Sequence, residues 1–191
     1  MQLNGTEDLR VKKTITAIHT AFEKLILAKD YEKITVAELA RSAQINKKTF
    51  YRYYPTKDDL LTEIQTQLSK QYLKEIAGLT YPADLAKSVR AFFAFSARQG
   101  PAYEKITIDT HYSIIRQQMI DTVMATTWSS SPAFNRLSAF KQRALLTYVQ
   151  NTGLAVYRQW VLDGKKEPLE EVAGVAVTLM QGGVTEFLKA D

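Results

Sequence analysis

Hydrophobic residues recur every three or four positions along most of the chain, which is the pattern of amphipathic helices. The first apolar stripe consists of Val11, Ile15, Ile18, Phe22, Leu25 and Ile26. This spacing predicts a helix over residues 9–28. Similar stripes, bounded by sparse Gly and Pro residues, predict further helices over 57–79, from Pro82 to Gly100, and over 102–109, 111–128, 137–162 and 169–188. Because no strand pattern competes with them, we expect an all-α fold.

Between the first two long helices the chain carries the signals for two short helices. Thr35 and Glu38 have the spacing of a capping box, which predicts a helix over 36–42. Asn46 is a favoured N-cap and predicts a second helix over 47–53. Two short helices joined by a tight turn and packed on a longer one form a helix-turn-helix, whose second helix can enter the DNA major groove.

The charge pattern of the same region favours a polyanionic partner. The stretch from Arg41 to Lys57 contains no acid; its cations are Arg41, Lys47, Lys48, Arg52 and Lys57, and its aromatics are Phe50, Tyr51, Tyr53 and Tyr54. Such a basic stripe neutralises phosphates and releases counterions. The net charge of +5 does not by itself distinguish nucleic-acid binding from solubility.

Composition and motifs exclude several classes of protein. The absence of Cys excludes a disulfide scaffold, a Cys-rich zinc site and a cysteine nucleophile, and two His residues are too few for a His-rich metal centre. No dinucleotide, P-loop, nucleophile-elbow or zinc-protease motif occurs. We therefore expect no catalytic residues, no cofactor and no metal. With no apolar run long enough to cross a membrane and a polar N-terminus, we expect a cytoplasmic protein with no membrane partner.

The other chemistry-bearing residues have two interpretations each. His19 lies on the polar side of the first helix and is expected to be exposed, and His111 is expected to be structural rather than ligand-sensing. Seven aromatics either line an effector pocket or fill the core, and their helical spacing favours the core: Phe92, Phe95, Tyr103, Tyr112, Trp128, Tyr157 and Trp160. The sequence assigns no ligand-binding residue.

The run ITVAELARSAQINKKTFYRYYPTKDDLL, residues 34–61, resembles the signature of TetR-family transcriptional regulators. This resemblance covers roughly the first 60 residues. It implies a three-helix helix-turn-helix DNA-binding domain over 1–56, followed by a C-terminal helical bundle over 57–191 for dimerisation and ligand sensing. The implied function is ligand-responsive regulation, by default repression, from a palindromic operator in double-stranded DNA. A small-molecule effector is the implied partner of the bundle.

The resemblance also implies which residues contact DNA. The expected DNA-binding residues are Thr35, Lys47, Lys48, Thr49, Tyr51, Arg52, Tyr53 and Lys57. Arg52 is the candidate for a base contact, and Lys57 is expected to donate to a phosphate. Phe50 and Tyr54 are expected to point into the small core. Gln44 departs from the family pattern because glycine often occupies its turn position, which implies a strained backbone there.

The family implies a four-helix interface, so we expect a homodimer formed through 137–162 and 169–188. Their small residues, which would let helices approach closely, are Gly153, Gly174, Gly182 and Gly183. The alternative is a TetR-like adaptor or co-regulator that acts mainly through protein–protein contacts. The acid-free stripe from Arg41 to Lys57 argues against that alternative, because an adaptor has no need of it.

Overall fold

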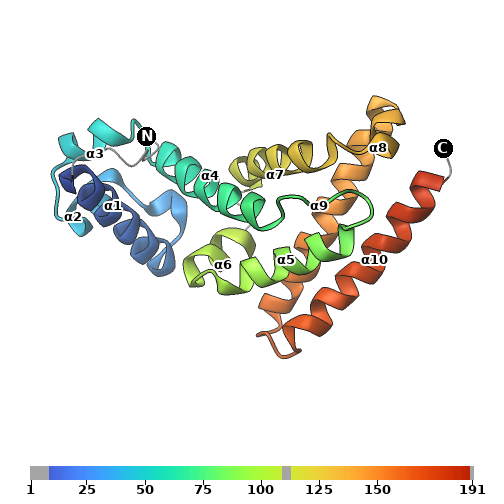
Figure 1. Cartoon of the computed structure of the whole chain (residues 1–191). Helices are drawn as coiled ribbons and strands as arrows, with labels where there is room; N and C mark the ends of the chain where they lie inside the picture. Colours follow the sequence, from blue (N-terminus) through green and yellow to red (C-terminus); the bar gives the residue numbers. More distant parts are fainter. Residues whose placement is uncertain (1–8, 109–112, 190–191) are drawn as a thin grey trace.

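The computed structural model describes residues 9–108 and 113–189, and over these ranges the chain forms helices and no strand (Figure 1). The N-terminal helices are α1 (Leu9–Ala28), the short 3-10 helix η1 (Tyr31–Lys33), α2 (Val36–Ser42) and α3 (Lys47–Tyr53). The remaining helices are α4 (Lys57–Glu75), α5 (Leu85–Arg98), α6 (Pro101–Ile108), α7 (Ser113–Trp128), α8 (Pro132–Arg136), α9 (Ala139–Leu162) and α10 (Leu169–Lys189). The prediction of an all-α fold is confirmed.

The helix-turn-helix forms through the predicted caps. The Thr35 backbone N–H donates to Glu38 over 3.0 Å, and the Glu38 N–H donates back to the Thr35 hydroxyl over 3.3 Å. At the start of α3, the Asn46 side chain accepts from the Thr49 N–H at 2.7 Å. Gln44 has a φ of 56°, so the turn does place a non-glycine residue in the left-handed region.

Three predicted boundaries are wrong, among them the start of α5, which lies at Leu85 rather than Pro82. The helix α4 ends at Glu75 rather than 79, before Gly78, whose φ of +83° cannot continue a helix. Residues 129–136 lie between two predicted helices, 111–128 and 137–162, but Pro132 begins the separate helix α8 there. The Ser131 hydroxyl caps α8, and Pro fits the first helical position because it has no N–H to satisfy.

Two hydrophobic cores stabilise the fold. The first is enclosed by α1–α4, and its buried residues are Ile18, Ala21, Phe22, Ile26, Tyr31, Ile34, Leu39, Ala43, Phe50, Tyr54, Leu60, Leu61 and, from α6, Ile106. The second lies among α5 and α7–α10 and is centred on large side chains such as Phe93, Trp128 and Tyr157. Because Ile106 comes from a distant part of the sequence, the first core is completed by the bundle.

Helices α4 and α6 connect the two cores (Figure 1). The first turn of α4 carries Leu60 and Leu61 into the first core, and α4 then extends alongside α7 and α5. Helix α6 packs against α1 on one side and α9 on the other. The Lys105 ammonium adds a polar link, because it donates to the Lys29 carbonyl just beyond α1 over 3.1 Å.

Candidate nucleic-acid interface

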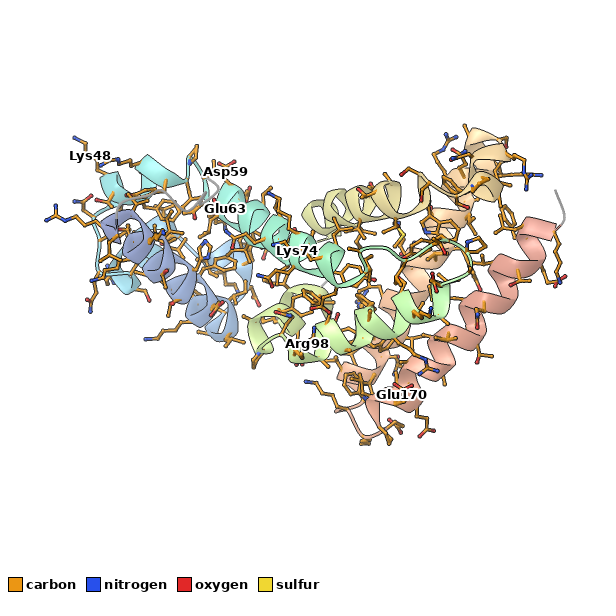
Figure 2. The ribbon with its side chains drawn as sticks, in the orientation of Figure 1. Lys48, Asp59, Glu63, Lys74, Arg98 and Glu170 are labelled. Carbon is orange, nitrogen blue, oxygen red and sulfur yellow. The ribbon has the colours of Figure 1, made fainter. Side chains whose placement is uncertain are left out.

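Four cations of the basic stripe are exposed on α2 and α3. The side chains of Arg41, Lys47, Lys48 and Arg52 all reach solvent, and no ion pair within the described part of the chain engages them. Figure 2 shows Lys48 pointing away from the body of the molecule at the tip of the helix-turn-helix. Unpaired cations on one face are available to neutralise phosphates.

Two of the expected DNA-binding residues already make hydrogen bonds within the N-caps of α2 and α3. The Thr35 hydroxyl donates to Glu38 over 2.8 Å, and the Thr49 hydroxyl donates to Asn46 over 2.9 Å. Lys29 also pairs with Glu38 and, together with the bonds from Thr35, lowers the pKa of this carboxyl to about 2. The Glu38 carboxylate therefore stays ionised. To donate to a phosphate, the Thr35 hydroxyl would have to release Glu38, and the Thr49 hydroxyl would have to release Asn46.

The aromatic residues of α3 divide between surface and core. Tyr51 is 52% exposed, and its ring meets the edge of Phe50 with centroids 5.8 Å apart. Phe50 and Tyr54 are buried, at 0% and 1% exposure, which confirms the prediction that they point inward. Tyr53 is half-buried against the first core. Tyr51 is thus the most accessible of the expected aromatic contacts.

Lys57 makes bonds that the sequence did not indicate. Its ammonium donates to the carbonyls of Tyr31, Ile34 and Glu32 over 2.8, 3.1 and 3.3 Å, and it lies 4.2 Å from the centre of the Tyr31 ring. These three acceptors match the three hydrogens of an ammonium group. Lys57 therefore ties the start of α4 to η1 and has no hydrogen left for a phosphate in this arrangement.

His19 is half-buried, so the expectation that it is exposed is wrong. Its Nε2 lies 3.1 Å from the hydroxyl of Tyr54. Burial lowers the pKa of His19 below 6.5, against the opposing pull of Glu63 and Glu23. Burial and the nearby Glu63 carboxylate raise the pKa of the Tyr54 hydroxyl. The α1 surface thus meets α3 and α4 through a polar contact that α1's own periodicity did not reveal.

A second candidate site is a cavity inside the bundle. It encloses about 1160 Å³ of space outside atoms, including its open mouth, and most of the surface that lines it is apolar. The lining aromatics are Tyr72, Tyr81, Phe92, Phe95, Tyr103 and Trp128. Mostly apolar walls with a few polar groups are typical of small-molecule sites. Four of the seven aromatics considered above therefore line a cavity, whereas Tyr157 and Trp160 fill the core.

The remaining sequence candidates add no site. His111 and Tyr112 lie outside the described residues. Where the structure describes the chain, it brings together no group of three or more metal-ligating acids and histidines. Over the same residues no helix combines the length and the apolar character that a membrane span requires.

Comparisons with known proteins agree with this geometry. A family model described as "Bacterial regulatory proteins, tetR family" matches residues 18–64, from within α1 to within α4. The uncharacterized HTH-type transcriptional regulator YxbF of Bacillus subtilis strain 168 is 35% identical over 74 residues. That match covers 38% of this chain and only 19% of YxbF, so the chain spans about a fifth of that relative's length.

Solved structures resemble the whole chain. A putative tetR family transcription regulator from Shewanella sp. PV-4 has a TM-score of 0.67 at 16% identity, over 89% of this chain and 97% of its own. The transcriptional regulator FadR of Bacillus subtilis, in complex with stearoyl-CoA, has a TM-score of 0.61 at 16% identity over 89% and 97%. At these identities the likeness shows the fold.

Three findings agree on the kind of protein: the helix-turn-helix carries unpaired cations, the family model matches that segment, and solved regulators share the fold over most of the chain. Residues 18–64 therefore carry the helix-turn-helix domain of the TetR family, and most of the chain has the fold of solved regulators of that family.

Proposed function

We propose that this protein is a ligand-responsive transcriptional repressor that binds a palindromic operator as a homodimer. The observation that carries the proposal is the exposed cation set on α2 and α3, joined through α4 and α6 to an apolar cavity. The cations supply affinity for DNA, and the cavity supplies a place for an effector. The repressor acts by occupying the promoter and excluding polymerase.

On the DNA, α3 enters the major groove. Arg52 reads a base edge, and Lys47 and Lys48 reach base edges or flanking phosphates. The hydroxyls of Thr35, Thr49, Tyr51 and Tyr53 bond phosphates and set the position of the helix. We leave Lys57 out of this set, because its ammonium is bonded to three carbonyls. Its part is to hold η1 and α4 together behind the interface.

A second copy of the chain completes the DNA-binding unit. The seven residues of α3 span only about 10 Å, which covers a few base pairs and is weak as a specific site. A two-fold dimer places two such helices about 34–36 Å apart, one turn of B-DNA. Each recognition helix then reads one half of a palindrome.

The dimer forms through α9 and α10. On α10, Val175 and Leu179 are 51% and 52% exposed although both are apolar, and Phe140 on α9 is 71% exposed. Gly174 and Gly182 face open space, so a partner helix can approach them closely. Gly153 and Gly183 instead pack within the chain, against Met180 and Tyr148 respectively, and support the fold rather than the dimer.

The effector acts through the helices that line both its cavity and the first core. Ile106 of α6 contacts the cavity and is also buried beside α1. A ligand that favours one position of α6 and α4 therefore changes the placement of the helix-turn-helix. Moving a population from 99:1 to 1:99 requires about 5.5 kcal/mol of preference between the two states.

Selection of fragments from a random DNA pool tests the proposal. We expect an enriched palindrome, with retarded migration at low salt that weakens steeply as salt rises. A protein that is monomeric at micromolar concentration and indifferent to DNA in low salt would refute it. That result would favour the adaptor, which works through protein partners alone.

A further inference from the structure

Two side chains that line the cavity each carry a buried polar atom with no hydrogen-bond partner among the described residues. One atom is the carbonyl oxygen Oε1 of Gln65 on α4, and the other is Nε1 of Trp128 at the end of α7. The two side chains are 4% and 0% exposed. Because a buried polar group without a partner is costly, such groups in a cavity mark places where a ligand can bind.

The two atoms offer opposite hydrogen-bonding roles. An amide oxygen only accepts, whereas an indole N–H only donates. The ligand must therefore present a donor to Gln65 and an acceptor to Trp128.

The positions of these residues along the bundle separate the two groups. The cavity follows α4 from Gln65 through Tyr72 to Ile76. Tyr72 and Tyr81 both contact the Ser88 hydroxyl, over 3.2 and 2.6 Å, and the Tyr81 ring lies 5.1 Å from that of Trp128. Trp128 thus belongs to the Tyr72 end, seven residues or about 10 Å along α4 from Gln65.

The walls between these ends are mostly apolar and aromatic, and the uncharged polar side chains of Ser69, Thr107, Thr127 and Gln150 also line the cavity. Where the structure describes the lining, it contains no Asp, Glu, Lys, Arg or His. A charged group placed there would lose its hydration without gaining an ion pair. The stearoyl-CoA seen with the Bacillus subtilis relative carries phosphates, for which these walls offer no cation.

We infer that the cavity binds a neutral, elongated, largely apolar molecule that carries a hydrogen-bond donor at one end and an acceptor at the other. The donor bonds Gln65 Oε1, and the acceptor takes the N–H of Trp128. This inference rests on the proposed function for its regulatory meaning, but the binding itself can be measured without DNA.

A matched set of naphthalenes tests the inference by isothermal titration calorimetry. The probe is 6-acetyl-2-naphthol, which has a hydroxyl donor and a carbonyl acceptor at opposite ends of a flat apolar body. In 6-ethyl-2-naphthol the acceptor is lost, and in 2-acetyl-6-methylnaphthalene the donor is lost. We expect each loss to weaken binding about fivefold, as for one hydrogen bond, and 6-hydroxy-2-naphthoate to bind weakest because of its charge.

Variants assign each end of the probe to its partner. In Trp128→Phe the acetyl and ethyl compounds should bind alike, and in Gln65→Met the hydroxyl and methyl compounds should bind alike. Trp160→Phe is the matched control, because the Trp160 N–H already donates to the Glu167 carbonyl at 2.9 Å and Trp160 does not line the cavity. It should keep both preferences of the unchanged protein.

The outcomes separate this inference from the proposed function. Equal affinities for the three neutral compounds, tighter binding of the naphthoate, or no binding of 6-acetyl-2-naphthol at millimolar concentration would overturn the ligand class. These comparisons use the unchanged chain, so they hold even if a variant fails to fold. Selective binding of the probe with no change in DNA affinity would support the ligand class and contradict ligand-responsive regulation.

Discussion

Replacing Lys57 by Met tests whether this residue holds the fold or contacts DNA. Met keeps most of the aliphatic stem and removes the ammonium, which leaves the carbonyls of Tyr31, Glu32 and Ile34 without their donor. Hydrogen bonds from a charged group contribute about 1.5–3 kcal/mol each when shielded, and less where water can replace the donor. The stacking on Tyr31 adds about 0.5–1 kcal/mol at a partly exposed site.

Because Lys57 is only half-buried, water replaces part of what is lost. We therefore expect the free energy of unfolding to fall by about 2–3 kcal/mol in total. Denaturant unfolding at a fixed protein concentration measures this change. Lys48→Met is the matched control: its side chain is exposed and unpaired, so its stability should stay within about 0.5 kcal/mol.

DNA binding at several salt concentrations completes the comparison. Each phosphate contact contributes about 1 to the slope of log affinity against log salt. Lys48→Met removes one contact from each copy, so we expect the slope for the dimer to fall by about 2. For Lys57→Met, measured where the variant is folded, the slope should not change. Unchanged stability together with a slope reduced by about two would refute the reasoning and return Lys57 to the phosphate contacts.

Three further predictions concern the interface, the dimer and the polar contact behind α3. Arg52→Ala should relax the preference at one base position in each half-site, as measured by selection from a random pool; an unchanged preference would reassign Arg52 to the DNA backbone. Leu179→Glu should weaken the dimer, because it places a charge where about 1.5–3 kcal/mol of apolar burial is expected in each copy. The control is Gln181→Glu, which is exposed but lies away from Val175 and Leu179 on α10 and should leave the dimer unchanged. Equal sedimentation of both variants would contradict the interface. Folding lowers the pKa of His19, so the unfolded chain binds a proton on this imidazole more tightly than the folded chain does. The contribution of neutral His19 to the free energy of unfolding is therefore present above pH 6.5 and is lost as the pH falls below it. Thermal unfolding of His19→Gln between pH 7.5 and 5 should therefore decline less than that of the unchanged protein, and parallel declines would exclude His19 as the cause.

The helix-turn-helix could be predicted almost to the residue, because its signals are local. The caps at Thr35 and Asn46 act within four residues, so the bounds of α2 and α3 follow from the sequence. The N-cap at Ser131 is equally local. Ser followed by Pro was a usable sign of α8, although none of the predicted helices includes these residues.

The partners of the site residues could not be predicted, because they are distant in sequence. Lys57 bonds carbonyls 23 to 26 residues earlier, and His19 meets Tyr54 across 35 residues. The lining of the cavity comes from six helices together with Tyr81, and helical periodicity cannot separate a residue that faces a cavity from one that faces a packed core. The acid-free stripe is a local signal, and it did predict the group of cations that the structure exposes on α2 and α3.

Ile106 has a consequence for engineering this protein. The interior beneath the recognition helix is closed by a side chain that lies 45 positions beyond Leu61, so a fragment cut at residue 56 would expose apolar surface from α1. Exchanging DNA specificity with another regulator by transplanting residues 1–56 would join a foreign α1 to this α6. A working chimera would need Ala102 and Ile106 chosen to fit the transplanted helix.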